Sequence, residues 1–537
     1  MNKDYAPAIA ANRFGLGARP GDLERIGTDA RGWLIEQLQG TPAVLSGEGL
    51  RPSREILAEG EEVLRKGREA AKQRPQNQSK REQAEMATGD TGQRAANGLI
   101  PSQPTGRGLQ AGPAMRGGQS LTFGANLSDT VREATGEAAK DSAVAPAVQS
   151  PPAATVSVIK PGEFYRPYYV AEITARLNHA VTTPRSFVER LTQFWTNHFA
   201  VSVDKAKVLG IAGAFEREAI RPHVLGNFAE MLLAVEHHPA MLLYLDNHLS
   251  VGPRSQLSVR RKKGRPLGIN ENLARETLEL HTLGVNGGYN QADVTTFAKV
   301  ITGWSIGGKT GPGDGGDPGA FMFRAGIHEP GAKIVLGKRY ADEGEGQGIA
   351  VLEDLARKPA TARFLATKLT RHFVADEPPA KVVDRVAKAY LKSNGDLPST
   401  YRALLEAPEA WRQPFSKYKT PADFVVSTYR ALELPAEGSR GRVGAFDLLG
   451  QRVFAPRSPA GWPDRGADWD GSSALMKRIE WADGLGQRLG NRKNAAQLAP
   501  QLLGNALSEA TRSAIAHAAS GAQALTLLLT APEFLRR

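Results

Sequence analysis

The chain has 537 residues, of which 41% are hydrophobic and 23% are charged, a composition typical of a globular protein that can bury a core. The formal net charge of +12 keeps anionic polymers among the partners to be considered. The sequence has no cysteine, which excludes disulfides, thiolate nucleophiles, cysteine-bound zinc and iron–sulfur clusters. Any metal would have to be held by His, Asp, Glu or Asn side chains.

The sequence shows no signal for export or for a membrane. Its first residues lack the apolar stretch of a signal peptide, and no apolar run approaches the roughly 20 residues that a membrane span needs. We therefore expect no membrane span and, by default, a cytoplasmic protein. The chain also lacks an aromatic RNA-binding motif, zinc-knuckle cysteines and a helix-turn-helix pattern, so no specific nucleic-acid binding is predicted.

Residues 1–40 are predicted to form an N-terminal helical element, because their apolar residues recur near helical spacing. Residues 41–160 differ sharply in composition. They are rich in Gly, Pro, Gln, Ala and Ser, contain few aromatic residues and have no sustained apolar period. Such a segment buries too little surface to offset the entropy of ordering it. We predict a low-complexity, largely disordered insertion that carries one charged helix.

Residues 161–434 regain the helical period and are predicted to form the main helical body. Within this body, a glycine-rich stretch over 303–319 precedes two short apolar runs, FMF and KIVLG, which are expected to pair as a small hairpin. Residues 435–537 contain a Pro/Trp-rich loop and terminal helices. The predicted fold is mainly α, a large multi-helix body with a small β-hairpin and a long disordered insertion.

Eight short blocks occur in a fixed order along the chain. They are FGLGARPG at 14–21, FWTNHF at 194–199, YLDN at 244–247, NENLARETLELHTLG at 270–284, ITGW at 301–304, KPATARFLATKLTRHFVAD at 358–376, PAGWPD at 459–464 and PEFLRR at 532–537. Together these blocks resemble the domain of unknown function 1800 family of uncharacterised bacterial proteins. The sequence departs from the family pattern at Lys358, where a histidine is common, and at Glu329, where an aspartate is frequent.

The resemblance covers nearly the whole chain except the insertion and the 303–319 stretch. It implies a shared fold and no settled biochemical activity. Family genes often lie beside a gene for a sulfatase-like protein, so the resemblance also implies a sulfatase-like protein as a partner.

The segment GWSIGGKT at 303–310 matches the spacing of a phosphate-binding P-loop. That mechanism requires a buried strand before the loop and a helix after it. Here the preceding DVTTFAKVITGW is typical of an amphipathic helix, and GPGDGGDPG follows, where no helix can start. We interpret the match as a coincidence and expect no nucleotide.

The richest polar cluster lies in 270–284, where Asn272, Glu276 and Glu279 fall at i, i+4 and i+7 and so share one helix face. Two carboxylates on one face could bind a metal or act as an acid/base pair. His281 lies about 140° around the helix from Glu276 at 100° per residue, so it is not expected on that face. The alternative interpretation is a salt-bridge network with arginines such as Arg275.

His328 is the best candidate outside a helix for a general base or a metal ligand, because loops carry function more often than helix interiors. An ordinary turn residue is the alternative. Polar residues also recur inside apolar helices, and Trp462 in the Pro-rich loop offers a stacking face for a sugar or another planar ligand. The pocket candidates are Asn197, His198, Asp246, Asn247, Asn272, Arg371, His372 and Trp462.

Two functional hypotheses remain open. The first is a soluble binding or assembly protein for an anionic polymer or a protein partner. It is slightly favoured because the sequence contains no complete catalytic signature. The second is a metal-assisted, hydrolase-like enzyme that uses Glu276, Glu279 and His328 as catalytic residues in a carboxylate/histidine cleft. Its candidate metal ligands are Glu276, Glu279, Asp246 and His198. A divalent metal is the cofactor considered, and neither haem nor a di-iron site is expected, since no Glu-x-x-His motif is present.

Overall fold

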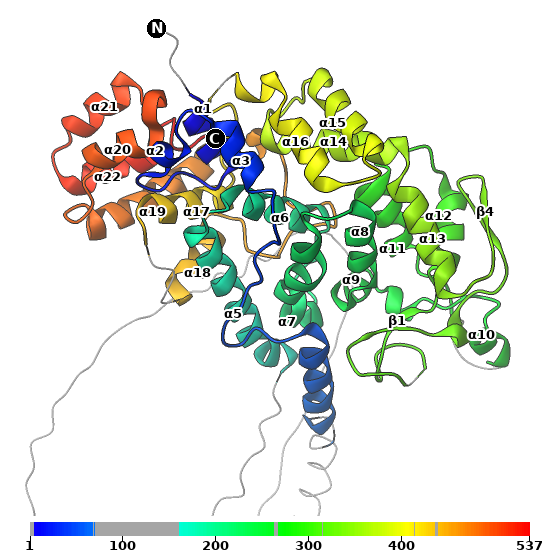
Figure 1. The fold of residues 1–537 in the computed structure, drawn as a ribbon. Coiled ribbons are helices and arrows are strands. Elements are labelled where there is room, and N and C mark those ends of the chain that lie inside the picture. Colours follow the sequence, from blue (N-terminus) through cyan, green and yellow to red (C-terminus); the bar gives the residue numbers. More distant parts are fainter. Residues whose placement is uncertain are drawn as a thin grey trace, which may run out of the picture. The chain divides into compact units, whose positions relative to one another are not determined.

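The computed structural model of the chain describes residues 5–67, 69, 160–261, 267–313, 315–412, 414–434 and 439–537, with the backbone alone over 439–443. Helices dominate these residues, and the only strands among them form two small antiparallel sheets (Figure 1). Residues 5–67 and 160–537 belong to one compact unit. The prediction of a mainly α fold with a small β component is confirmed.

The N-terminal part contains short helices that pack into the core through Ile9, Phe14 and Leu34. The elements are α1 (Ala6–Ile9), the π-helical η1 (Ala10–Phe14), α2 (Asp22–Ile26) and α3 (Ala30–Glu36). A further helix covers residues 53–67.

This further helix lies inside the segment predicted as an insertion. Its Ile56 and Leu57 are buried in the same core as the flanking helices. The described residues continue through residue 67, and most of the predicted insertion lies outside them, so the boundary at residue 41 stays a prediction.

The central part begins with two long helices and continues through shorter ones. The elements are α5 (Pro161–Thr182), α6 (Ser186–His198), α7 (Ala206–Phe215), η2 (Glu216–Ile220), η3 (Arg221–His223), α8 (Phe228–His237), α9 (Pro239–Tyr244), η4 (Asn247–Leu249), α10 (Gln256–Arg260), α11 (Asn272–Glu276), η5 (Thr277–Thr282) and α12 (Gln291–Val300). Of these, η2 and η5 are π-helical turns that continue an α-helix.

The strands pair differently from the prediction. β1 (Trp304–Ile306) pairs with β2 (Phe321–Phe323), and β3 (Lys333–Val335) pairs with β4 (Lys338–Tyr340). The predicted pairing of FMF with KIVLG is therefore wrong. Leu336 and Gly337 both have positive φ values, of 51° and 77°, so a tight two-residue turn folds KIV back on the strand that follows it directly.

The same region settles the structural context of the P-loop-like segment. Gly303 lies between α12 and the short strand β1, and Gly307 and Gly308 follow β1. Among the described residues, the next element in the chain is the strand β2. Neither the buried parallel strand nor the helix that a P-loop needs is present in the described residues here.

The remaining helices complete the core and form the C-terminal region, drawn in orange and red in Figure 1. They are α13 (Glu345–Ala356), α14 (Pro359–Phe373), α15 (Ala380–Lys392), α16 (Leu397–Leu405), η6 (Ala325–Ile327), η7 (Pro408–Trp411), α17 (Pro421–Ala431), α18 (Ser439–Leu448), η8 (Gly466–Asp468), α19 (Ser472–Leu489), α20 (Ala495–Leu503), η9 (Gly504–Ala506), α21 (Glu509–Ala516) and α22 (Gly521–Thr530).

Helix α6 lies at the centre of the fold. Ten of its thirteen residues are buried, including Phe187, Leu191 and Trp195, which are 0% exposed. A helix that is buried on nearly every side cannot keep its polar residues in water. Each polar side chain of α6 must therefore find a partner inside the protein.

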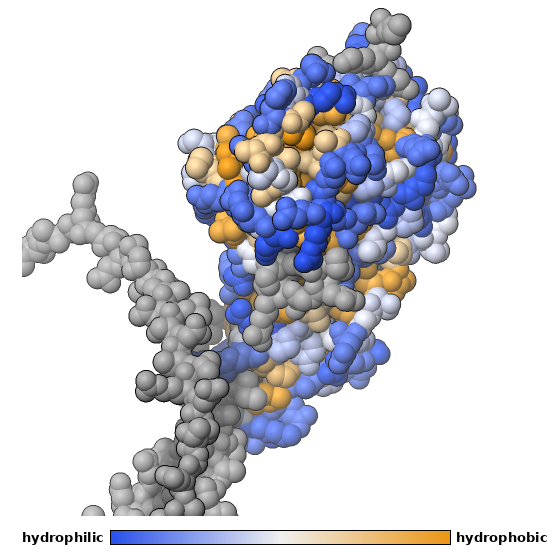
Figure 2. All heavy atoms as spheres, turned by 90° about the vertical axis from the view of Figure 1, so that its left-hand side faces the viewer, coloured by the Kyte–Doolittle hydropathy of each residue, from blue (hydrophilic) through white to orange (hydrophobic). Residues whose placement is uncertain are grey.

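Hydrophilic side chains cover most of the face shown in Figure 2, and apolar side chains appear there in separate groups. No helix among the described residues is long and apolar enough to span a bilayer.

A buried hydrogen bond between Trp195 and Tyr401 contributes to the stability of the core. The indole Nε1 of Trp195 donates to the Tyr401 hydroxyl at 2.6 Å, and that hydroxyl donates to the Val224 carbonyl at 3.0 Å. Tyr401→Phe should lower the free energy of unfolding by about 1–3 kcal/mol, because both partners lose their bond inside the core. The part-buried hydroxyl of Tyr340, which donates to Asp354 at 2.8 Å, provides the control Tyr340→Phe. Equal losses for the two variants in urea denaturation would contradict this prediction.

Candidate functional site

A cavity of about 110 Å³ lies beside α6. It is lined by one face of α6, by Arg176 of α5, by His372 of α14, by the start of α17, by the loop over 451–464 and by Arg537. The cavity thus joins segments from the middle and the end of the chain.

Helix α6 supplies the polar floor of the cavity. Arg190, Gln193 and Asn197 are spaced by three and four residues, which places them on one face of the helix. The apolar residues Phe187, Leu191 and Trp195 occupy the rest of its circumference and pack into the core.

The deepest part of the site is a buried carboxylate shared by two arginines. Asp423 Oδ1 accepts from Arg190 Nη1 at 2.9 Å, and Arg537 Nε lies 3.0 Å from Asp423 Oδ2. The side chains are only 2% exposed for each arginine and 7% exposed for Asp423. Burial alone would raise the pKa of Asp423, but Arg190 and Arg537 lower that pKa far below its usual value. Two positive charges therefore face one negative charge.

Three residues that line the cavity each have a buried nitrogen without a hydrogen-bond partner among the described residues. These atoms are Gln193 Nε2, His372 Nε2 and Arg537 Nη1. Burial, together with the charges of Arg537 and Arg190, lowers the pKa of His372 well below its usual value, so its imidazole is neutral at pH 7. Buried polar groups in native proteins are nearly always paired, so three unpaired groups around one cavity require an explanation.

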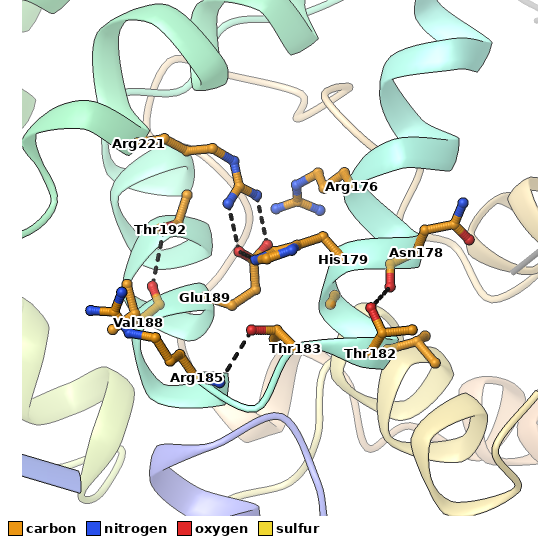
Figure 3. Close-up of polar contacts among 12 residues, drawn as sticks. Arg176, Asn178, His179, Thr182, Thr183, Arg185, Val188, Glu189, Thr192 and Arg221 are labelled. Carbon is orange, nitrogen blue, oxygen red and sulfur yellow. Dashed lines mark hydrogen bonds and ion pairs between the residues drawn. The ribbon is translucent and has the colours of Figure 1, made fainter. Parts of the chain in front are cut away.

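A second network, of buried ion pairs, connects α6 to the cavity residue Arg176. The Glu189 carboxylate of α6 accepts hydrogen bonds from Nη1 and Nη2 of Arg221, at 2.6 and 2.7 Å. Figure 3 shows this pair of bonds with His179 and Arg176 beside it. Arg221 also reaches Glu216 at 2.8 Å. Glu216 in turn holds the cavity residue Arg176 at 2.7 Å. These ion pairs fix the position of the Arg176 guanidinium.

The loop over 451–464 is attached to α6 by one side chain. Asn197 Nδ2 donates to the carbonyl of Trp462 at 2.9 Å, and Asn197 Oδ1 accepts from the Trp462 N–H at 2.7 Å. Gly461 has a φ of +82°, and a Cβ there would come within 2.3 Å of the Asn197 carbonyl. The loop can therefore approach α6 this closely only with glycine at position 461.

The charges around the cavity are predominantly positive. The charged lining residues are Arg176, Arg190, Arg452, Arg537, Asp423 and Asp464. Four arginines against two aspartates leave the lining with an excess of positive charge, part of which Glu216 compensates through Arg176.

Of the pocket candidates predicted from sequence, the cavity brings together Asn197, His372 and Trp462. Arg371, the neighbour of His372, donates through Nε to the Asp376 carbonyl at 3.3 Å instead. His198 is buried at the end of α6, where its Nε2 lies 3.1 Å from the His281 carbonyl.

Glu276 and Glu279 lie elsewhere, at the junction of α11 and the π-helical η5, and both are half-buried. Burial raises the pKa of Glu276, His281 opposes that shift, and Glu279 adds to it. The prediction for His281 assumed a period of 100° per residue, which does not hold across η5. The reason is the wider π-helical turn, in which the Leu283 N–H bonds to the Leu278 carbonyl five residues back.

The neighbouring candidates have partners of their own. His281 Nδ1 lies 2.7 Å from Glu236 Oε1 inside the core. Arg275 pairs with Glu271 at 3.1 Å. The Tyr289 hydroxyl bonds to Glu279.

Asp246, Asn247 and Asn272 have local structural roles. Asp246 adopts a φ of +58° and pairs with Lys205 at 2.7 Å. The buried Asn247 donates to the carbonyls of Ile301 and Trp304. Asn272 is exposed at the start of α11.

His328 lines a different groove, of about 450 Å³, together with Arg254, Phe323 and Asp342. Its Nδ1 lies 2.8 Å from the Thr302 carbonyl, and its Nε2 lies 3.9 Å from Asp342 Oδ1. Burial lowers the pKa of His328.

In the described part of the chain, no three His, Asp or Glu side chains form a group that could hold a metal ion. Among the described residues, the predicted metal candidates Glu276, Glu279, Asp246 and His198 do not form such a group. The described side chains give the metal hypothesis no ligand set.

Among the cavity residues that were not predicted from the sequence, the most important are Arg190, Gln193, Asp423 and Arg537. Charged residues in an amphipathic pattern are normally assigned to the solvent face, so the sequence offered no reason to expect Arg190 to be buried. Asp423 carried one readable signal, because Thr420 and Asp423 form a capping box at the start of α17. Its second role, between two arginines, depends on residues 233 positions before it and 114 positions after it in the sequence.

Comparisons with known proteins agree with the sequence blocks. A family model described as "Protein of unknown function (DUF1800)" matches residues 9–536, essentially the whole chain. No curated protein and no solved structure matches.

Because Asp423 pairs with two buried arginines, a conservative substitution there should strongly lower the stability of the protein. Asp423→Asn keeps the size of the side chain but leaves Arg190 and Arg537 buried without a counter-charge. We expect a loss of about 3–5 kcal/mol in the free energy of unfolding. The matched control is Asp384→Asn, which breaks an ion pair with Arg363 whose side chains are 58% and 64% exposed, and which should cost less than about 1 kcal/mol. Similar midpoints of urea denaturation for the two variants would refute the role of Asp423.

Lys419, next to the cavity, predicts a pH dependence of stability. Its Nζ donates to Ser427 Oγ at 3.0 Å, and burial, with the charges of Arg190, Arg478 and Arg537, lowers its pKa to about 7 against the pull of Asp423. Between pH 7 and about 10 the unfolded chain keeps the proton on this lysine and the folded chain does not. Stability from this group therefore rises with pH, by at most about 1.4 kcal/mol per pH unit.

Lys419→Met should remove this rise, whereas Lys392→Met at an exposed position should keep it. The measurement is the free energy of unfolding of each variant and of the wild type between pH 7 and 10. A Lys419→Met profile parallel to the wild type would show that Lys419 is charged in the folded protein throughout this range.

Proposed function

The chain belongs to the family of proteins of unknown function DUF1800, and we propose that it is a binding protein whose cavity takes up a small anionic group. Carboxylate, sulfate and phosphate groups share the required chemistry, since all of them are negatively charged and accept several hydrogen bonds.

One observation carries the proposal, namely the three unpaired nitrogens of Gln193, His372 and Arg537 around a single cavity. The amide and the guanidinium nitrogens can only donate, and a neutral imidazole can donate through Nε2. An acceptor-rich ligand would pair all three. A cation would meet the excess of positive charge, and the amide and guanidinium nitrogens have no lone pair to offer it.

The electrostatic balance of the site supports the same ligand. Asp423 already serves both Arg190 and Arg537, so its charge is compensated twice. An anion placed beside Arg537 would complete the balance in an environment where charge-assisted hydrogen bonds are strong.

The size of the cavity limits what can enter it. A volume of about 110 Å³ accommodates several water-sized groups but no long segment of a polymer. An anionic polymer, the partner class predicted from the net charge, would therefore present a single end group or side group to the site. The sulfatase-like partner that the family resemblance implies stays a prediction.

The hydrolase-like alternative receives less support from the contacts. It requires Glu276, Glu279 and His328 to meet in one cleft, whereas Glu276 and Glu279 lie at the junction of α11 and η5 and His328 lines a separate groove.

The proposal predicts anion-dependent stabilisation. At constant ionic strength set with NaCl, acetate, sulfate or phosphate should raise the melting temperature of the protein beyond the effect of chloride, because a ligand that binds only the folded state stabilises it. Isothermal titration calorimetry then gives the dissociation constant of that anion.

Gln193→Met distinguishes the cavity from other sites. It removes an unpaired buried donor while keeping the length of the side chain, so the fold should lose little stability. Anion affinity should fall about tenfold or more, since a hydrogen bond to a charged group contributes roughly 1.5–3 kcal/mol. Gln487→Met, at an exposed position of α19, is the control. The proposal fails if no anion exceeds chloride, or if Gln193→Met binds the anion as tightly as the wild type.

A further inference from the structure

The loop over 451–464 contributes an aromatic wall to the cavity. Trp462 is half-buried and lines the cavity, and its backbone is held by the two hydrogen bonds that it shares with Asn197. Behind it, the Trp469 ring lies 6.0 Å from the Trp462 ring, and Trp469 Nε1 donates to the Pro463 carbonyl at 3.2 Å. The backbone that carries the Trp462 indole is therefore fixed before any ligand arrives, which lowers the entropy cost of binding.

Next to this wall the cavity presents groups that can pair with hydroxyls. Gln451 Oε1 accepts from the Ala422 N–H at 2.8 Å, which leaves its amide nitrogen as a donor. Thr420 Oγ1 accepts from the Asp423 N–H at 3.1 Å, which leaves its hydroxyl hydrogen to donate. Asp464 lines the cavity as an acceptor, and Lys368 Nζ lies 3.5 Å from one of its oxygens. The wall thus combines an apolar face with both donors and an acceptor.

Hydroxyl groups both donate and accept, so they match such a mixed set, whereas the carboxylate of Asp464 has nothing to pair with on a purely aromatic acid. A sugar ring also offers an apolar face of C–H groups that packs against an indole. From this arrangement we infer that the anionic group is carried by a sugar ring, and that the ligand is a sugar acid of the uronic acid class.

This inference rests on the proposed anion binding and adds the part of the ligand outside the anionic group. The carboxylate takes the place next to Gln193, His372 and Arg537, and the ring lies against Trp462 with its hydroxyls towards Gln451 and Asp464. Specificity for a sugar acid over a simple carboxylate then comes from the loop, and affinity for the charge comes from α6 and Arg537.

Four probes test it by calorimetry at one ionic strength: D-glucuronate, D-glucose, acetate and benzoate. Glucuronate should bind about tenfold more tightly than acetate, a difference of about 1.4 kcal/mol, and glucose, which lacks the charge, should bind more weakly than glucuronate. Trp462→Ala should reduce glucuronate affinity to that of acetate and leave acetate affinity unchanged. Trp462→Phe should retain most of the advantage, because it keeps an aromatic face.

Acetate binding by Trp462→Ala also shows that this variant is folded around the cavity. Equal affinities of the wild type for glucuronate and acetate would overturn the sugar inference and leave the proposed anion binding intact. Tighter binding of benzoate than of glucuronate would overturn it in favour of an aromatic acid. Absence of binding by both carboxylates, with no stabilisation by sulfate or phosphate, would overturn the inference and the proposed function together.

Discussion

The structure depends on a helix that is buried on nearly every side and nevertheless carries two adjacent charges, Glu189 and Arg190 of α6. Removing such charges from water is costly, and the cost is offset only when each has a well-placed counter-charge and further hydrogen bonds. Glu189 finds Arg221 in η3, and Arg190 finds Asp423 in α17. Two segments, η3 and α17, are therefore held in one arrangement around α6.

The cavity follows from an imbalance in these pairings. On the Glu189 side, Arg221 and Arg176 are matched by Glu189 and Glu216, so that network is neutral. On the other side, one carboxylate serves both Arg190 and Arg537. The same region also leaves buried donors without acceptors. Three buried donors without acceptors around one cavity, next to an excess of positive charge, are the pattern expected where a ligand completes the structure.

The sequence predicted what local periodicity controls. The recurrence of apolar residues predicted the helical body over 161–434, where the structure has helices. It failed where a longer-range or less regular feature decides the outcome. The π-helical turn of η5 changes the angular spacing of residues 277–282, which a period of 3.6 residues cannot show. Arg190 follows the pattern of a solvent-facing charge, and its burial is set by distant segments that supply the Gly15 carbonyl and Asp423 as its partners. Of the candidate site, Asn197, His372 and Trp462 were identified as polar or aromatic residues in unusual surroundings, but nothing local indicated that they meet.

The geometry of α6 also relates the two halves of the inferred ligand to each other. Gln193 and Asn197 are four residues apart on the same face, a rise of about 6 Å along the helix axis. Gln193 belongs to the group of unpaired donors, and Asn197 holds the loop that carries Trp462. Because one rigid helix positions both, the distance between the place for the charge and the aromatic wall is fixed and comparable to the width of a single sugar ring. A change that moves the loop without touching the donors should therefore alter selectivity among carboxylates more than affinity for the smallest of them.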